Sequence, residues 1–260
     1  MNYFLALFAG AIQGLTEFLP VSSTGHLIIF EHIFNISQKD FGLAFDASLH
    51  LGTLFAVLLF FFKDYLSVFN FKNGLLIKLL IGTIPAAILG LFFENFIENQ
   101  FRSIFLVGCS LIIFSIVMIV AEIMAAKKKL GKEISKKDSF LVGLAQALAL
   151  IPGISRSGAT ISAGLFLKQT RVSAARFAFL LSGPIIAGAG AKKFFDVVLR
   201  ENLTSDDFKF FIVGIISSAI FGYLTIKYFL KYLQTNTLYP FIIYRIILGA
   251  ILILLPILTR

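Results

Sequence analysis

Long runs of apolar residues are the feature that most restricts how this 260-residue chain can fold. A helix that crosses the hydrocarbon of a bilayer needs about 20 mostly apolar residues. Six runs come close to that length: 43–62, 76–92, 103–124, 172–191, 210–226 and 238–258. Hydrophobic residues make up 58% of the sequence and the mean hydropathy is +0.92, which excludes an ordinary soluble fold. The chain is therefore predicted to be an all-α polytopic membrane protein with six transmembrane helices.

Two further apolar segments, 4–35 and 140–167, are interrupted near their middles by Pro, Gly, Ser and Thr. Proline lacks an amide donor and stops a helix, so each segment is predicted to form a re-entrant helix-loop-helix hairpin. Non-helical backbone is tolerated at membrane depth only where protein buries it or where it lines a water-filled cavity. Both loops are therefore expected to face one pocket. A single kinked spanning helix is the alternative for each segment.

The sequence also repeats itself weakly. Gly14-Leu15-Thr16-Glu17 parallels Gly143-Leu144-Ala145-Gln146, and each tetrapeptide precedes a proline and a Ser-rich turn. We therefore divide the single integral membrane domain, 1–260, into a first repeat over 1–124, a basic linker over 125–137 and a second repeat over 138–260. One hairpin and three spans in each half make an odd number of crossings, which inverts the second repeat relative to the first. The two hairpin tips are then expected to meet near the middle of the bilayer.

Basic residues predict the orientation and the partners. The linker 125–137 carries six lysines, whereas the loop expected at 93–102 offers two glutamates and Arg102, so the linker is placed on the cytoplasmic side. Both termini then lie outside. The formal net charge is +9, but Lys and Arg lie between apolar runs rather than among aromatic residues on a polar face. Membrane lipids are therefore the expected partners, and nucleic acid is not.

Three ionisable residues lie in or next to the interruptions of these segments, namely Glu17, His26 and Arg156. Each costs roughly 2.5–3.5 kcal/mol at the centre of a membrane helix, or about 8–10 kcal/mol for the three together. Such a cost implies compensation. Glu17 could pair with Arg156, coordinate a cation or act as a general base, and a purely structural Glu–Arg pair is the alternative to a functional site.

The residues around these charges favour a phosphate site. An arginine fork matches phosphate oxygens, and a glycine-containing turn can present successive amide groups to an anion. The hydroxyl side chains of the two loops and their glycines would supply this environment: Ser22, Ser23, Thr24, Ser155, Ser157 and Thr160, with Gly25, Gly153 and Gly158.

Other polar residues in apolar runs are harder to place. His26 follows the first turn, where it could activate Ser22 or Ser23 as a nucleophile or protonate a leaving oxygen. Asp46 and His50 share a helix face and either line the pocket or bond between helices. Arg176 is expected at the membrane interface. Arg245 lies in the run 238–258 and Glu122 in the run 103–124, and neither run holds a comparable cluster of polar residues. Both residues are therefore left outside the predicted site.

With these residues assembled, the chain resembles the undecaprenyl-diphosphatase family, the bacitracin-resistance phosphatases that recycle the lipid carrier of cell-wall synthesis. Its first signature appears as the run from Gln13 to His26, with Glu17 and the Pro20-Val21-Ser22-Ser23-Thr24-Gly25-His26 turn. The second appears as the run from Pro152 to Thr160. The resemblance covers essentially the whole chain. It implies six spans and two re-entrant hairpins in an inverted repeat, with a site open to the outer face of the bacterial inner membrane.

The resemblance also implies hydrolysis of undecaprenyl diphosphate to undecaprenyl phosphate with a divalent cation, Mg²⁺ or Ca²⁺. The implied catalytic residues are Glu17, Ser23, His26 and Arg156, and Glu17 is also the metal ligand. The implied substrate-binding residues are Gln13, Ser22, Thr24, Gly25, Gly153, Ser155, Ser157, Gly158 and Thr160. Gln13 stands where the pattern allows a second carboxylate, so diphosphate oxygens would have to complete any metal site. Attack by Ser23, attack by an activated water and a homodimeric state are left open.

Two competing functions follow from the same sequence. Inverted repeats with broken helices are also the architecture of transporters, so a polyprenyl-phosphate transporter or flippase is the main alternative. A second membrane lipid-phosphatase superfamily uses a Pro-Ser-Gly-His turn and then Ser-Arg with a histidine six residues after the arginine. Here that position is Ser162, and no histidine follows His50, so its phosphohistidine chemistry has no nucleophile.

Overall fold

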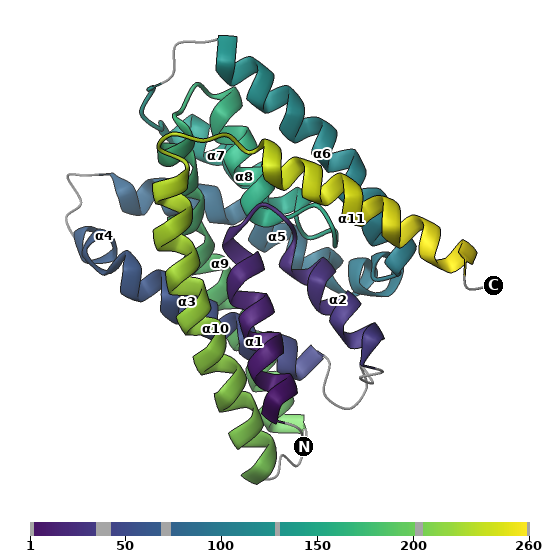
Figure 1. Ribbon diagram of the computed structural model, residues 1–260. Coiled ribbons are helices and arrows are strands. Elements are labelled where there is room, and N and C mark those ends of the chain that lie inside the picture. Colours follow the sequence, from purple (N-terminus) through teal and green to yellow (C-terminus); the bar gives the residue numbers. More distant parts are fainter. Residues whose placement is uncertain (1–2, 35–42, 69–73, 128–130, 201–204, 259–260) are drawn as a thin grey trace.

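The computed structural model describes residues 3–34, 43–68, 74–127, 131–200 and 205–258, and every regular element within these ranges is a helix (Figure 1). The helices are α1 (Tyr3–Phe18), α2 (Ser23–Ile33), α3 (Leu43–Phe60), α4 (Phe62–Ser67), α5 (Leu75–Phe101), α6 (Ile104–Lys127), α7 (Lys136–Leu148), α8 (Arg156–Phe166), α9 (Arg171–Arg200), α10 (Ser205–Tyr232) and α11 (Tyr239–Leu258). The prediction of an all-α chain is confirmed over the described residues.

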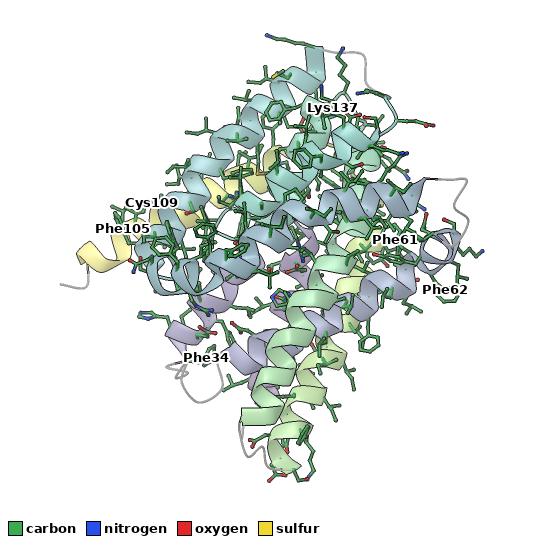
Figure 2. All side chains as sticks on the ribbon, turned by 180° about the vertical axis from the view of Figure 1, so that it is seen from behind. Phe34, Phe61, Phe62, Phe105, Cys109 and Lys137 are labelled. Atoms are coloured by element: carbon green, nitrogen blue, oxygen red, sulfur yellow. The ribbon has the colours of Figure 1, made fainter. Side chains whose placement is uncertain are left out.

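Four described helices are long and apolar enough to cross a membrane: 75–93 in α5, 104–127 in α6, 171–190 in α9 and 205–232 in α10. Shorter apolar helices cover 3–18, 45–60 and 239–254. Large apolar side chains point outward around the bundle, including Phe62 and Phe105, whereas Lys137 lies at one end of the molecule (Figure 2). Outward-facing phenylalanines are unfavourable in water and suit lipid, so the protein is a polytopic membrane protein.

The predicted spans overlap the observed helices, but several boundaries differ. Helix α9 continues to Arg200 and α10 covers 205–232, so both exceed the predicted 172–191 and 210–226. The loop expected at 93–102 is mostly helical, because α5 continues without a break to Phe101. The run 43–62 is divided at Phe61 into α3 and the short α4. The linker 125–137 is partly helical as well, since α6 extends to Lys127 and α7 begins at Lys136; residues 128–130 of this linker lie outside the described ranges.

Both interrupted segments form helix-loop-helix hairpins, α1 with α2 and α7 with α8 (Figure 1). Helix α1 packs along α10, and α7 packs along α5. Glycine allows the close approach of α1: a Cβ atom on Gly14 would lie 2.6 Å from the Ser218 carbonyl oxygen and 2.7 Å from the Gly222 nitrogen. Each hairpin is therefore held mainly by a helix from the other half of the chain.

The start of α7 is fixed by a capping box. The Ser135 hydroxyl accepts from the Asp138 amide, and the Asp138 carboxylate accepts from the Ser135 amide and from Lys132 Nζ. Burial alone would raise the pKa of the Asp138 carboxyl, but these hydrogen bonds outweigh burial and lower it. A charged, fully bonded Asp138 anchors the hairpin beside the basic linker.

Candidate active site

The two hairpin loops, residues 19–22 and 149–155, meet inside the protein. The Gly153 amide donates to Ser22 Oγ over 3.2 Å, and Ser157 Oγ donates to the Leu19 carbonyl oxygen over 2.8 Å. Residues more than 130 positions apart in the sequence are thus hydrogen-bonded directly. The expectation that both breaks face one place in the protein is confirmed.

The helices after the two loops begin in the same unusual way. Ser22 caps α2 with φ 74°, and Ser155 caps α8 with φ 75°. Each hydroxyl accepts from an amide three residues on, that of Gly25 and that of Gly158. An N-cap normally has extended backbone, and a positive φ at a non-glycine residue costs of order 1–3 kcal/mol. Strain stored twice at one place is typical of a functional site.

Arg245 of α11 holds the two loops together, although it was predicted to lie outside the site. Its guanidinium is completely buried and donates to the Pro20 carbonyl oxygen of the first loop over 3.2 Å and to the Gly153 carbonyl oxygen of the second over 2.9 Å. It also donates to the Leu111 carbonyl oxygen and to Ser115 Oγ of α6. The rigid fork of Arg245 therefore fixes both loops against α6.

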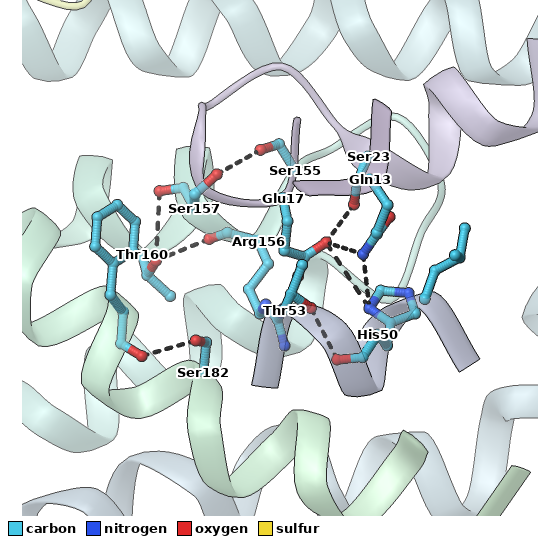
Figure 3. A network of polar contacts seen from close by, with 12 residues as sticks. Gln13, Glu17, Ser23, His50, Thr53, Ser155, Arg156, Ser157, Thr160 and Ser182 are labelled. Atoms are coloured by element: carbon cyan, nitrogen blue, oxygen red, sulfur yellow. Dashed lines mark hydrogen bonds and ion pairs between the residues drawn. The ribbon is translucent and has the colours of Figure 1, made fainter. Parts of the chain in front are cut away.

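The Glu17 carboxylate is the centre of the polar network (Figure 3). Its Oε1 forms an ion pair with Arg156 of the other hairpin. Its Oε2 accepts from Ser23 Oγ over 2.5 Å and from Gln13 Nε2 over 2.9 Å, and it lies 3.9 Å from His50 Nδ1. The expected approach of Glu17 and Ser23 to Arg156 is confirmed.

A cavity of about 600 Å³ opens beside this network, a size typical of small-molecule sites. Its polar lining includes Glu17, Ser23, His50 and Arg156, and much of the remaining wall is apolar. The apolar residues come from the second loop and from α2, α5 and α9: Leu27, Ala86, Ala87, Leu91, Leu150, Ile151, Ile185 and Ile186. The cavity thus has a polar region suited to a charged group and an apolar wall suited to a hydrocarbon chain.

The first turns of α2 and α8 border this cavity through Ser23, Thr24 and Arg156. The first amides of a helix have no carbonyl partner within the helix, and the helix dipole places partial positive charge there. Two such helix starts and one arginine facing the same space favour an anion.

Of the remaining predicted substrate-binding residues, some line the cavity and others do not. Ser22, Thr24 and Ser155 line the cavity. The other predicted substrate-binding residues are not among its lining: Gln13, Gly25, Gly153, Ser157, Gly158 and Thr160. They hold the lining in place instead. Thr160 Oγ1 donates to the Arg156 carbonyl oxygen, and Gly153, at φ 95°, leaves no room for a Cβ atom beside Val107 and Ser110.

His26 lies apart from the Glu17 network. Its Nδ1 bonds the Ser22 carbonyl oxygen over 2.7 Å, and its Nε2 bonds the Tyr244 hydroxyl over 2.7 Å. Its ring stacks on Tyr244 and does not line the cavity. The expected position beside Ser23 in the site is therefore not observed, and a catalytic role for His26 stays a prediction.

His50 holds the place in the network that was expected for His26. Its Nδ1 lies 3.0 Å from Gln13 Nε2, and its side chain lines the cavity. Asp46, one turn earlier on α3, also lines the cavity, where Arg102 lies 3.3 Å from it and 3.4 Å from Glu31. The spacing of Asp46 and His50 signalled a shared face, but it did not decide between pocket and helix contact.

The other isolated charges lie outside the site, as predicted. Glu122 is paired with Arg171 and accepts from the Leu238 amide. Arg176 is half-exposed and pairs with Asp64 over 2.6 Å. Neither pair lines the cavity.

A divalent cation would find few protein ligands here. No group of three or more His, Cys, Asp or Glu side chains suited to a metal ion occurs among the described residues. Glu17 supplies one carboxylate, and Oε1 of neighbouring Gln13 is a buried oxygen without a hydrogen-bond partner in the described part of the chain. These two oxygens fit a hard cation only if a bound ligand contributes further oxygens.

Comparison with known proteins places this chain in one family. The family described as bacitracin resistance protein BacA matches residues 6–251. An undecaprenyl-diphosphatase of Thermodesulfovibrio yellowstonii is 44% identical over 252 residues, covering 97% of this chain and 96% of that protein. An undecaprenyl-diphosphatase of Rubrobacter xylanophilus is 41% identical over 260 residues, covering 95% of each. With its apolar helices and buried loop pair, this chain is a multi-pass bacterial membrane protein that belongs to the bacitracin resistance protein BacA family.

Proposed function

We propose that this protein hydrolyses undecaprenyl diphosphate to undecaprenyl phosphate and inorganic phosphate, which recycles the lipid carrier of cell-wall synthesis. The observation that carries the proposal is the junction of Glu17, Ser23 and Arg156 at a cavity with apolar walls. The identities of about 40% to relatives named undecaprenyl-diphosphatase support the same substrate. The diphosphate would occupy the polar lining, and the first isoprene units would lie against the apolar wall.

Ser23 is the proposed nucleophile. Its hydroxyl already donates to Glu17 Oε2 over 2.5 Å, so Glu17 is placed to take the proton as Ser23 Oγ attacks the terminal phosphorus. The bond from that phosphorus to the bridging oxygen breaks, and undecaprenyl phosphate leaves. Water then hydrolyses the phosphoserine and releases inorganic phosphate.

Arg156 and the loop amides are proposed to stabilise the transferring phosphoryl group. Arg156 is paired with Glu17, and its fork would turn from the carboxylate to the phosphoryl oxygens when substrate binds. The first amides of α2 and α8 would donate to the same oxygens, because charge develops there in the transition state. Arg245 contributes by holding both loops in register.

We further propose that Mg²⁺ or Ca²⁺ is bound by Glu17, with oxygens of the diphosphate completing its coordination. When bound, the cation would neutralise charge on the phosphate oxygens. The Gln13 carbonyl oxygen is the neighbouring protein group suited to support it.

The proposed topology is six spans and two re-entrant hairpins in an inverted repeat, in the bacterial inner membrane, with the cavity open to the outer side. The matching caps at Ser22 and Ser155 and the reciprocal packing of α1 on α10 and α7 on α5 support duplication. The basic linker beside α7 supports a cytoplasmic position for that end.

Purified protein in detergent is expected to release inorganic phosphate from undecaprenyl diphosphate. Chelation with EDTA should abolish most of this release, and added Mg²⁺ or Ca²⁺ should restore it. Colorimetric measurement of phosphate gives both results. A transporter or flippase would release none, because detergent leaves no second compartment, and a rate unaffected by EDTA would remove the proposed cation.

A phosphoserine at Ser23 is the second expected result. Substrate labelled with ³²P in its terminal phosphate should transfer label to the protein in acid-quenched samples, and peptide mapping should place it on residue 23. Ser23→Ala should carry no label, whereas Ser22→Ala, which alters the adjacent hydroxyl, should still be labelled. Full activity without any labelled protein, together with an active Ser23→Ala variant, would identify water as the attacking group.

A further inference from the structure

Gln146 is a buried polar residue that the proposed mechanism does not use. It lies in the last turn of α7, is only 2% exposed, and lines the same cavity as Glu17 and Arg156. Both its Nε2 and its Oε1 are without a hydrogen-bond partner among the described residues. Leaving a buried amide unpaired costs about 1–3 kcal/mol, so such groups normally have a partner. Because Gln146 lines a cavity, a ligand bound there can be that partner.

The position of Gln146 relates it to Glu17. Gly14-Leu15-Thr16-Glu17 and Gly143-Leu144-Ala145-Gln146 each end next to a loop, on α1 and α7 respectively. Glu17 is charged and can take a proton. Gln146 is neutral and can donate a hydrogen bond to an anion without repelling it. The two hairpins thus present different groups to one cavity.

The surroundings of Gln146 indicate which part of a ligand it would reach. Glu17, Ser23 and Arg156 bond one another, whereas Gln146 bonds none of them. Thr83, a polar cavity residue on the neighbouring α5, already donates its hydroxyl to the Leu79 carbonyl oxygen. The Gln146 amide is therefore separate from the Glu17 network, so its donor is available to a part of the ligand that this network does not hold.

We propose that Gln146 is a substrate-binding residue whose side-chain amide donates to the phosphate that stays on the lipid, so that the site distinguishes a diphosphate from a single phosphate. This proposal rests on the proposed hydrolysis of a lipid diphosphate. It assigns the transferred phosphoryl group to the first hairpin, to Arg156 and to the first amides of α8, and the remaining phosphate to Gln146 of α7.

Gln169 provides a matched control. It is also buried, at 1% exposure, and its amide atoms also have no partner among the described residues. It differs from Gln146 in that it does not line the cavity. Leucine at either position removes a buried amide at similar volume, so any general effect of that change on folding should be shared.

The test compares wild type, Gln146→Leu and Gln169→Leu in detergent. A hydrogen bond to a charged group is worth roughly 10-fold or more in affinity, so Gln146→Leu should raise KM for undecaprenyl diphosphate about 10-fold, with Gln169→Leu unchanged. Binding without turnover is measured by the rise in unfolding temperature with inorganic pyrophosphate or with orthophosphate. Gln146→Leu should weaken the apparent affinity for pyrophosphate about 10-fold and leave that for orthophosphate unaltered.

Each other outcome overturns the proposal. Wild-type KM and pyrophosphate affinity in Gln146→Leu would show that Gln146 contacts no substrate, and an equal loss in Gln169→Leu would show a general burial effect. Equal weakening for both anions would place Gln146 at the transferred phosphate. If Gln146→Leu does not fold, Gln146→Glu keeps the size and replaces the donor by an anion, so unchanged KM in that variant also overturns the proposal. Absence of phosphate release by wild type would instead refute the proposed function, while the pyrophosphate measurement would still report on Gln146.

Discussion

Replacing Glu17 by glutamine is expected to lower kcat for phosphate release by about 10²–10⁴-fold, the usual contribution of a general base. The amide has nearly the same shape as the carboxylate but cannot take the proton that Ser23 Oγ now donates to Oε2. It also leaves Arg156 without its anionic partner. Initial rates at saturating undecaprenyl diphosphate measure this effect directly.

Glu122→Gln is the matched control for that experiment. Glu122 is likewise a buried glutamate paired with a partly buried arginine, Arg171, but this pair lies outside the cavity. Breaking a buried pair by removing one partner costs about 3–5 kcal/mol, so both variants should unfold at a lower temperature. Only Glu17→Gln should lose kcat in the folded protein. Full phosphate release by Glu17→Gln would remove Glu17 from catalysis and leave it as a structural ion pair.

Much of the architecture was predictable because lipid imposes a simple rule on sequence. Spanning helices must be apolar over a fixed length, so the predicted runs coincide with α3, α5, α6, α9, α10 and α11 to within a few residues at most of their ends. The proline residues in 4–35 and 140–167 located both loops, because proline lacks an amide donor and stops a helix. Predicted and observed boundaries differ most at the ends of α5 and α9, which continue to Phe101 and Arg200. The five polar or charged residues in 94–100 do not stop α5, because a helix can extend beyond the hydrocarbon.

The centre of the site was predictable and its periphery was not. Glu17 and Arg156 are too costly to bury apart, so their meeting followed from their depth alone. The choice between His26 and His50 depended on which way each ring points, and helix spacing does not determine this across hairpins. His26 lies close to Ser23 in sequence, yet its ring bonds Tyr244, whereas His50 reaches Gln13 from α3. Gln146 was visible as the counterpart of Glu17, but only the structure shows that it lines the cavity and that its amide has no partner among the described residues.

Arg245 had no sequence signal at all, because its partners are mostly backbone carbonyls. A lone arginine in an apolar run, without a carboxylate at helical spacing, resembles a residue that reaches toward the membrane surface. Its actual acceptors, on Pro20, Gly153 and Leu111, come from three distant segments of the chain. No periodicity relates these positions, so only the folded structure reveals that one guanidinium joins both loops.

Replacing Arg245 by methionine is accordingly expected to lower kcat/KM by about 10²-fold, the effect of misplacing reacting groups by roughly 1 Å. Methionine fills the volume but leaves the Pro20 and Gly153 carbonyl oxygens without their donor, so the two loops lose their shared register. The unfolding temperature should fall as well, because buried acceptors left unpaired cost about 1–3 kcal/mol each.

Lysine at the same position separates charge from geometry. Arg245→Lys keeps a cation in the bundle but replaces the planar fork by a single ammonium group, which cannot reproduce the bonds to both loops and to Ser115. It should therefore recover only part of the lost kcat/KM. Phosphoserine labelling at Ser23 should fall in parallel with kcat/KM in both variants, because Arg245 acts through the position of the loops. If both variants kept the wild-type kcat/KM while unfolding at lower temperature, Arg245 would stabilise the bundle without positioning the site.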